Sequence, residues 1–480
     1  MIALSPAEIA AATDGKLVGI DDGDAPCVVG VCIDSRQVRD GQLFVAIAGE
    51  RVDGHDHAAE AVASGASCVL AARPLLAADG SPLPCIVVAD PVLALGSLAA
   101  WYRRQRLDCT VVAITGSSGK TSTKDLIGRV LSTAVPTVTA EGSFNSEVGL
   151  PLTVLRADED TRFLVLEMGM RGEGHIAYLV SLVMPDIAVV LNVGSAHLGV
   201  VGSREAIARA KSEIVRELPS TAVAVLNEDD PVVRAMADVT MARVVTFGES
   251  ASADVRATDV RVDRAARPSF TLCDTMADEA LPVDLRLSGE HFVSNACAAA
   301  AVGRVAGLAM EQVVDALRAA DADSRWRMEV HVAPGGFTVI NDAYNANPES
   351  MRAALKSLAA MASGRRSWAV LGEMRELGEA SMEEHDAIGR LVARLEISRL
   401  VCIGDATGVM HAGASSEWQG GGESIHVPDV DAAIALLREQ VRPDDVVLVK
   451  ASRSIGLERV AEALLAGPAT DASGTGAGGA

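Results

Sequence analysis

The fold is decided by the stretch Cys109-Thr-Val-Val-Ala-Ile-Thr-Gly-Ser-Ser-Gly-Lys-Thr-Ser-Thr123, in which an apolar run leads into a glycine-serine loop ending in Lys-Thr. This pattern predicts a β-strand, a tight loop and a helix. Backbone N–H groups of residues 116–120, the helix N-terminus and the Lys120 ammonium would surround phosphate oxygens. The Thr121 hydroxyl is placed to hold Mg2+. The stretch therefore predicts a triphosphate cradle; the alternative is a glycine-serine turn that opens a helix by chance.

The loop departs from the usual nucleotide-binding spacing. In the pattern G-x4-G-K-[ST] a glycine stands five positions before the second glycine. Here Ile114 occupies that position before Gly119, and the first glycine of the loop is Gly116. We therefore expect a shortened variant of the loop.

Length and charge limit the classes of protein to which the chain can belong. The 480 residues predict about three domains. The net charge of -22, from 42 basic and 64 acidic residues, argues against general attraction to nucleic acid or anionic lipid. An anionic ligand must then be met by local cations and metal. There is no run of about 18 apolar residues and no basic segment at the start, so we expect a cytoplasmic protein without stable membrane insertion.

The cysteines occur singly, without a C-x-x-C pair, and several lie in apolar runs. This usage predicts reduced thiols in the core, with a zinc site as the alternative. The eight are Cys27, Cys32, Cys68, Cys85, Cys109, Cys273, Cys297 and Cys402.

Three regions of the chain differ in pattern. Residues 1–100 alternate short apolar runs with alanine-rich helical patterns, which predicts a small α/β domain. Residues 101–325 predict a largely parallel, doubly wound sheet with helices on both faces. Residues 326–466 contain a third set of β-runs, and residues 467–480 form a low-complexity tail that we expect to be disordered.

The predicted elements of the two larger regions are defined by apolar runs. The stretch 250–268 predicts an antiparallel sheet edge, and 292–305 predicts a helix. The predicted strands lie at 111–114, 163–166, 187–191, 222–226 and 244–247, and then at 337–340, 368–371, 400–403 and 446–449.

Polar residues follow two strands of the predicted central sheet. Glu167 ends one run, and Asn192 and His197 follow the next. Doubly wound sheets bind ligands at the carboxyl ends of their strands, so these side chains should face the loop that carries Thr121. A magnesium site is the sharper interpretation. A capping or salt-bridged carboxylate and a structural histidine are the alternatives.

Further candidates follow other strands or lie on helices. Lys211 lies in a helical pattern, where most lysines are solvated. Asp342 precedes an Asn- and Pro-rich turn that can be purely structural. Lys450 and Arg453 follow a strand and suit an anion, and residues 34–36 (Asp-Ser-Arg) precede a strand and suit a second phosphate.

Taken together, these motifs resemble those of the Mur ligases of bacterial cell-wall synthesis, in their dipeptide-adding form, over residues 4–466. The resemblance also explains the short loop, since the family's loop looks like this one. The motifs are Thr115-Gly-Ser-Ser-Gly-Lys-Thr-Ser122, Leu166-Glu-Met-Gly-Met170, Asn192-Val-Gly-Ser-Ala-His-Leu198, Asn341-Asp-Ala-Tyr-Asn-Ala-Asn-Pro-Glu-Ser-Met351, Val370-Leu-Gly-Glu-Met-Arg-Glu-Leu-Gly378 with His385, and Val449-Lys-Ala-Ser-Arg453.

The resemblance implies an architecture and a reaction. It implies an N-terminal domain for the UDP end of the substrate (1–100), a central P-loop ATPase (101–325) and a Rossmann-like closing domain (326–466). The implied enzyme is a monomer that uses ATP and Mg2+ to join D-alanyl-D-alanine to UDP-N-acetylmuramoyl-tripeptide. The peptide carboxylate attacks the γ-phosphorus, and the dipeptide amine then attacks the resulting acyl phosphate.

The resemblance also implies roles for individual residues. Catalytic residues would be Lys120, Glu167, His197 and Lys211. Magnesium would be held by Thr121, Glu167, His197 and, as a carbamate, Lys211. ATP would be bound by Thr115, Gly116, Ser117, Ser118, Gly119, Lys120, Thr121, Ser122, Asn295, Arg327 and Asp342. Substrate would be bound by Asp34, Ser35, Arg36, Asn145, Lys450, Ser452 and Arg453.

Two departures from the family pattern concern the ATP site. Phe292 replaces the asparagine expected after His291. Trp326 stands where glycine is commoner, so that either Arg325 or Arg327 could reach the phosphates.

Two other functions fit the same motifs. A sister ligase would add a single amino acid, as the diamino-acid-adding Mur enzyme and folylpolyglutamate synthase do; the segment 371–378 has the dipeptide-adding form instead. A regulatory module would hydrolyse ATP without joining two substrates. Such a module would not need a full set of residues that bind the metal and the ribose. The third residue of the acceptor peptide, meso-diaminopimelate or lysine, stays open.

Overall fold

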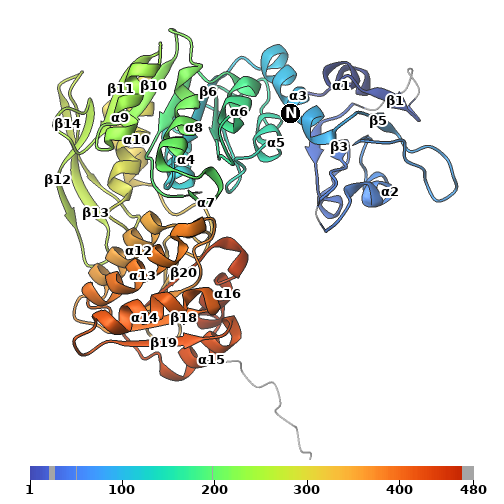
Figure 1. The fold of residues 1–480 in the computed structure, drawn as a ribbon. Coiled ribbons are helices and arrows are strands. Elements are labelled where there is room, and N and C mark those ends of the chain that lie inside the picture. Colours follow the sequence, from blue (N-terminus) through green and yellow to red (C-terminus); the bar gives the residue numbers. More distant parts are fainter. Residues whose placement is uncertain (21–26, 50, 197, 468–480) are drawn as a thin grey trace, which may run out of the picture. The chain divides into compact units, whose positions relative to one another are not determined.

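A computed structural model describes residues 1–20, 27–49, 51–196 and 198–467 (Figure 1). The predicted tail lies outside these residues except for Gly467. The chain contains three sheets, of five, nine and six strands. It divides into two compact units, one of Met1–Val193, Ala208–Arg256 and Cys297–Ala316, and one of Gly194–Ile207, Ala257–Ala296 and Leu317–Ala480.

The N-terminal sheet has the order β1-β5-β4-β3-β2, with β1 antiparallel to β5 and the other pairs parallel. Ser5 begins the first helix with a capping box to Glu8. A core of small residues around Phe44 packs against the sheet. The small α/β fold predicted for this region is confirmed. Its elements are α1 (Pro6–Thr13), β1 (Lys16–Val18), β2 (Gly30–Cys32), β3 (Gln42–Val45), α2 (Ala58–Ala63), β4 (Cys68–Ala71), β5 (Cys85–Val87) and α3 (Pro91–Arg106).

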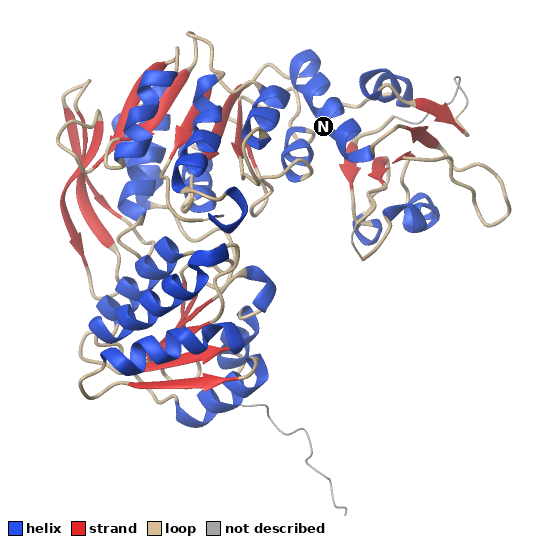
Figure 2. Ribbon diagram, in the orientation of Figure 1, coloured by secondary structure: helices blue, strands red, loops and turns tan. Residues whose placement is uncertain are grey.

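The central sheet has the order β14-β13-β12-β11-β10-β9-β6-β8-β7. Each neighbouring pair of strands from β7 through β12 is parallel, and β10 is buried along its whole length, as expected of a sheet covered on both faces (Figure 2). The five predicted central strands and the helix at 292–305 are confirmed. The strands are β6 (Thr110–Thr115), β7 (Thr137–Thr139), β8 (Phe163–Glu167), β9 (Ile187–Val190), β10 (Val223–Asn227), β11 (Arg243–Gly248), β12 (Val255–Val262), β13 (Pro268–Asp274) and β14 (Glu279–Asp284).

The antiparallel edge extends further along the chain than the predicted stretch 250–268. Strand β12 pairs in parallel with β11, whereas β13 and β14 form an antiparallel pair at the edge. The α-helices of the central region are α4 (Lys120–Ser132), α5 (Gly149–Val154), α6 (His175–Val183), α7 (Leu198–Val201), α8 (Arg204–Arg216), α9 (Pro231–Arg234), α10 (Phe292–Val305) and α11 (Met310–Arg318).

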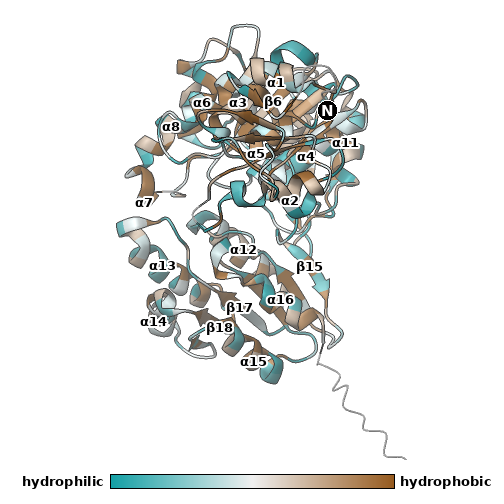
Figure 3. Cartoon of the chain, turned by 90° about the vertical axis from the view of Figure 1, so that its right-hand side faces the viewer, coloured by the Kyte–Doolittle hydropathy of each residue, from teal (hydrophilic) through white to brown (hydrophobic). Residues whose placement is uncertain are grey.

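The third sheet has the order β15-β16-β20-β17-β18-β19, with β15 antiparallel and the others parallel. Strands β17 and β20 are buried throughout, and β17 and β18 are largely brown in Figure 3. The four strands predicted here are confirmed. The elements are β15 (Glu329–Val332), β16 (Thr338–Asn341), α12 (Pro348–Met361), β17 (Ser367–Leu371), α13 (Ser381–Arg394), β18 (Arg399–Ile403), α14 (Gly408–Glu417), β19 (Glu423–Val427), α15 (Val430–Gln440), β20 (Val446–Lys450) and α16 (Glu458–Leu465).

All eight cysteines are free thiols. Four are buried, as the sequence predicts, and burial raises the pKa of both Cys68 and Cys402 to about 12. Cys27 is exposed instead. Among the helices of the described ranges, none has the length and apolar character needed to cross a membrane.

Candidate phosphate and magnesium site

The glycine-serine loop joins β6 to α4. Gly119 has a φ of 81°, the left-handed conformation that favours glycine, and the helix begins at the next residue. The Lys120 Nζ atom donates a hydrogen bond to the Gly116 carbonyl at 2.8 Å, so its ammonium lies over the loop. A Cβ atom added to Gly116 would lie 2.9 Å from the Cβ of Leu191, which explains why this position takes no side chain.

Asn192, which follows β9, holds the loop from the neighbouring strand. Its Oδ1 atom accepts hydrogen bonds from the backbone N–H groups of Ser117 and Ser118, both at 2.9 Å. Two of the amides that the sequence assigns to phosphate thus have a partner within the protein. Asn192 follows a predicted strand, but it is not among the predicted site residues.

Three of the predicted residues meet at the end of β8. One oxygen of Glu167 accepts a hydrogen bond from the Thr121 hydroxyl at 2.7 Å, and the other accepts one from the Asn145 side chain at 2.7 Å. Glu167 is 1% exposed, and no described residue forms an ion pair with it. Since a buried carboxylate without a cation is costly, this cluster fits a bound divalent cation. Within the described ranges, no three His, Cys, Asp or Glu side chains are grouped for a metal.

Lys211 lies on α8 and is 2% exposed. None of the described residues makes a hydrogen bond or an ion pair with its amine. Burial, and then the positive charge of Lys120, hold the pKa of Lys211 well below its usual range. The structure therefore contradicts the alternative of a solvated lysine. His197, the remaining predicted metal ligand, lies outside the described residues.

The other residues of the loop have structural contacts. The Thr115 hydroxyl donates to the Met168 carbonyl at 3.0 Å and joins β6 to β8. Ser122 lies on α4 and is partly buried.

A second cluster lies at the carboxyl ends of the adjacent strands β16 and β20. Asp342 and Lys450 form an ion pair with an O–N distance of 2.6 Å, in which Lys450 is buried and Asp342 is partly buried. The other oxygen of Asp342 accepts a hydrogen bond from the Met328 N–H group at 3.1 Å. These contacts fix the carboxylate that the resemblance assigns to ATP binding.

His291 and Asn295 belong to the same compact unit as this ion pair. Burial lowers the pKa of His291 to about 4; Asp342 partly opposes this effect and Lys450 adds to it. The Nδ1 atom of His291 and the Nδ2 atom of Asn295 are buried without a hydrogen-bond partner. His291 is not among the predicted site residues, although it precedes Phe292, one of the two departures from the family pattern.

The arginines near the third sheet stack on aromatic rings. The guanidinium of Arg327 lies 4.3 Å from the centre of the Tyr344 ring, and that of Arg453 lies 4.2 Å from the Trp326 ring. Trp326 has a φ of 60°, which explains why glycine is commoner at this position. The Ser452 hydroxyl accepts a hydrogen bond from the Arg375 N–H group at 2.9 Å.

The Asp-Ser-Arg turn of the N-terminal region lies after β2. Asp34 and Arg36 pair with each other at 2.7 Å, and this pairing lowers the pKa of Asp34 to about 2. The Ser35 hydroxyl donates to Glu60 at 3.2 Å. Nothing in this geometry marks a phosphate site apart from the exposed arginine.

Comparisons with known proteins agree across the chain. The Mur ligase family, catalytic domain, matches residues 28–102, the Mur ligase middle domain matches 114–303, and the Mur ligase, glutamate ligase domain, matches 326–453. The UDP-N-acetylmuramoyl-tripeptide--D-alanyl-D-alanine ligase of Mycobacterium tuberculosis is 48% identical over 97% of this chain and 98% of its own. The Bacillus subtilis enzyme of that name is 34% identical over 92% and 93%.

Solved structures of MurF proteins are also similar to this chain over nearly its whole length. A crystal structure of MurF from Acinetobacter baumannii has a TM-score of 0.84 and 31% identity, covering 97% of this chain and 99% of that one. MurF ligase from Thermotoga maritima in complex with ADP has a TM-score of 0.76 and 30% identity, covering 91% and 97%.

Proposed function

The chain belongs to the Mur ligase family, and we propose that it joins D-alanyl-D-alanine to UDP-N-acetylmuramoyl-tripeptide at the expense of ATP. The observation that carries the chemistry is the buried Glu167 carboxylate, which contacts Thr121 and Asn145 beside the glycine-serine loop. The choice of substrates rests on the relatives, which match over nearly their whole length.

The reaction has two steps. A carboxylate oxygen of the tripeptide bonds to the γ-phosphorus while the bond to ADP breaks, which gives an acyl phosphate. The free amine of the dipeptide then bonds to the acyl carbon, phosphate leaves, and the amine loses a proton. Lys120 is the mobile cation for the transferred phosphoryl group, and binding the two reactants side by side supplies much of the rate increase.

The residues around Glu167 fit a magnesium ion. Thr121 and Glu167 would hold it, with His197 as a further ligand. Magnesium, when bound, offsets negative charge on the phosphates during phosphoryl transfer. Asn145 contacts the same carboxylate and would hold the peptide beside it.

Lys211 would complete this site as a carbamate. Its depressed pKa favours the neutral amine, the form that adds to CO2; the nitrogen bonds to the carbon and releases a proton. The product is an anion, which converts a buried neutral amine into a metal ligand.

The remaining site residues are proposed from the resemblance. Asn295, Arg327 and Asp342 would bind ATP, together with the loop residues. Lys450, Ser452 and Arg453 would bind substrate from the third domain, and residues 34–36 would bind the UDP end. The ion pair of Asp342 with the buried Lys450 supports a positioning role for Lys450.

The domains and setting are likewise proposed. Each of the three sheets lies within one of the ranges 1–100, 101–325 and 326–466. We propose these ranges as the UDP-binding, ATPase and closing domains of a cytoplasmic monomer. Equal scattering profiles with and without an ATP analogue and acceptor would argue against closure.

The test is phosphate release with Mg-ATP, UDP-N-acetylmuramoyl-tripeptide and D-Ala-D-Ala, leaving out each in turn, with mass spectrometry of the product. A UDP-muramoyl-pentapeptide formed only in the complete mixture supports the proposal. Product with a single amino acid would favour a sister ligase. ATP hydrolysis indifferent to both substrates would favour a regulatory module.

A further inference from the structure

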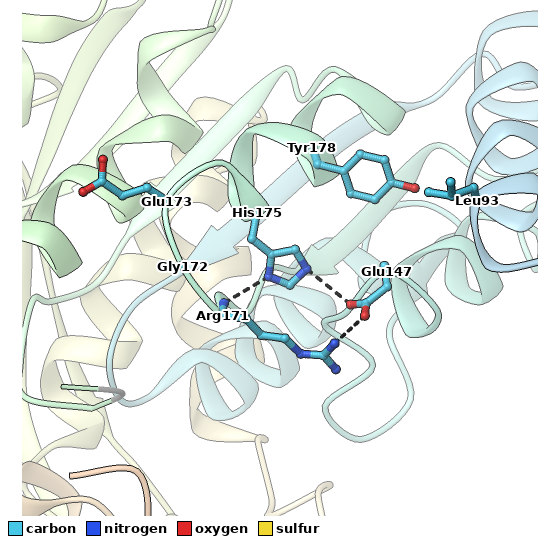
Figure 4. Close-up of a pocket in the computed structure, with 7 residues that line it drawn as sticks. All are labelled: Leu93, Glu147, Arg171, Gly172, Glu173, His175 and Tyr178. Carbon is cyan, nitrogen blue, oxygen red and sulfur yellow. Dashed lines mark hydrogen bonds and ion pairs between the residues drawn. The ribbon is translucent and has the colours of Figure 1, made fainter. Parts of the chain in front are cut away.

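A pocket of about 470 Å³ lies within a single compact unit, the one that also contains the Glu167 cluster (Figure 4). Its size is in the range of small-molecule sites. The segments that lead from the cluster form its walls: Glu147 lies two residues after Asn145, and Arg171 lies four residues after Glu167. The lining residues are Leu93, Glu147, Arg171, Gly172, Glu173, His175 and Tyr178.

The pocket has charges of both signs at one side. One oxygen of Glu147 accepts a hydrogen bond from the Arg171 guanidinium. The other lies 3.3 Å from His175 Nε2, yet both atoms are buried without a hydrogen-bond partner. Burial acts to raise the pKa of Glu147, but a backbone hydrogen bond and the charges of Arg171 and His175 outweigh it, and the pKa is lowered. The Arg171 side chain is 70% exposed, so its guanidinium can reach a ligand.

The other side of the pocket is apolar. The exposed side chain of Leu93, on α3, and the ring of Tyr178, on α6, lie next to each other (Figure 4). Leu93 is 57% exposed, which leaves its surface free to cover methylene groups of a ligand. An aliphatic chain that ends in charged groups would fit these two sides.

We infer that this pocket binds the side chain of the third residue of the acceptor peptide, and that it selects a side chain ending in both an ammonium and a carboxylate group. The inference rests on the proposed function, in which the reacting carboxylate belongs to that third residue and lies at the Glu167 cluster. Its side chain must then project from the adjacent carbon, toward the walls that continue from Asn145 and Glu167.

The charges fit meso-diaminopimelate better than lysine. The ammonium common to both would pair with Glu147, whereas Arg171 would pair with a carboxylate that only diaminopimelate carries. The incoming dipeptide also bears both charges, but its amine must be unpaired and deprotonated to attack the acyl carbon. A carboxylate at its amine would oppose that step, so we assign the pocket to the tripeptide.

The experiment compares the tripeptides containing meso-diaminopimelate and lysine, by calorimetric binding without ATP and by kcat/KM with Mg-ATP and D-Ala-D-Ala. The wild type should favour the diaminopimelate form. Arg171→Gln should lower the affinity and kcat/KM for the diaminopimelate tripeptide by about tenfold or more, as expected for the loss of a charge-assisted hydrogen bond. Both quantities should stay within about twofold of the wild type for the lysine tripeptide. Glu147→Gln should weaken both forms, and Arg171→Lys should restore part of the preference.

Glu173→Gln is the matched control. Glu173 lines the same pocket, but its carboxylate turns away and pairs with Arg209 at 2.6 Å, so the preference should not change (Figure 4). Thermal unfolding of each variant checks that the fold is retained.

Two results would overturn the inference: equal binding and turnover of the two tripeptides by the wild type, or an equal loss for both in Arg171→Gln. A rise in the KM for D-Ala-D-Ala alone would assign the pocket to the dipeptide, which also overturns it. Failure of both tripeptides to bind or react would instead count against the proposed function, and so the two failures can be told apart.

Discussion

Replacing Glu167 by glutamine separates a metal-binding role from a structural one. The amide has nearly the same shape, but it removes the carboxylate that accepts hydrogen bonds from Thr121 and Asn145. If this carboxylate serves magnesium and the phosphates, Glu167→Gln will lose ligase activity while the protein without ligands keeps its stability.

The magnitudes follow from burial and contacts. Weakening a charge-assisted hydrogen bond costs about 1.5–3 kcal/mol. Removing a carboxylate that is 1% exposed and has no ion-pair partner among the described residues relieves a desolvation penalty of several kcal/mol. The two effects offset, so the free energy of unfolding should change by less than about 2 kcal/mol. Loss of electrostatic stabilisation of the transition state should cost about 3 kcal/mol, or about a hundredfold in kcat.

The assays are urea unfolding without ligands, the rise in Tm on adding Mg-ATP, and phosphate release in the complete reaction. Glu213→Gln is the control, because Glu213 is also buried but accepts hydrogen bonds from Gly174 N–H at 2.6 Å and Ala177 N–H at 2.9 Å. It should lose about 1–3 kcal/mol of stability and keep the response of Tm to Mg-ATP.

The reasoning is refuted if Glu167→Gln keeps activity within tenfold of the wild type. It is also refuted if the variant loses more stability without ligands than Glu213→Gln does, since Glu167 would then be a structural acceptor like Glu213.

Three further changes test other parts of the site. In Lys211→Met, added bicarbonate should no longer raise activity as it does in the wild type. Without bicarbonate, the wild-type free energy of unfolding should rise with pH up to about 10.4, because Lys211 binds a proton in the unfolded chain but not when it is buried. Urea titrations of Lys211→Met at several pH values should not show this rise. Asn192→Ala removes the side-chain oxygen that accepts hydrogen bonds from two loop amides, although the Ser117 N–H keeps its bond to the backbone carbonyl of residue 192 at 3.1 Å; the variant should cost about 1–3 kcal/mol in urea unfolding and raise the KM for ATP, and an unchanged KM would mean that the loop keeps its shape without this side chain. Trp326→Ala loses the stack on Arg453 and keeps the left-handed backbone, so it should be less stable than Trp326→Gly by about 1 kcal/mol; the reverse order in thermal melts would argue against strain.

The strands could be predicted where they are buried on both faces. Runs such as 163–166 and 446–449 are continuous apolar segments, and they became β8 and β20. Strands β7, β15 and β19 were missed because they lie at sheet edges and all their residues except Val427 are half-buried or exposed, which leaves no continuous apolar run in the sequence.

The site could be predicted where residues follow strands. Thr121 lies in the first turn of the helix that follows β6, and Glu167 ends the neighbouring strand β8, so the sheet topology alone brings them together. Side-chain pairs could not be predicted in this way. The ion pair of Asp342 with Lys450 joins residues 108 positions apart, and no local sequence pattern indicates it. The proposed pocket was missed for the same reason, since Glu147 and Arg171 look like ordinary surface charges in the sequence.

The most direct test of the account follows one oxygen atom. A tripeptide labelled with 18O in the carboxylate that reacts is incubated with Mg-ATP and D-Ala-D-Ala, and the released phosphate is analysed by mass spectrometry. The account predicts that one 18O atom passes from the carboxylate to phosphate, because the acyl phosphate breaks at the acyl carbon. Phosphate without the label, formed alongside the pentapeptide product, would contradict it.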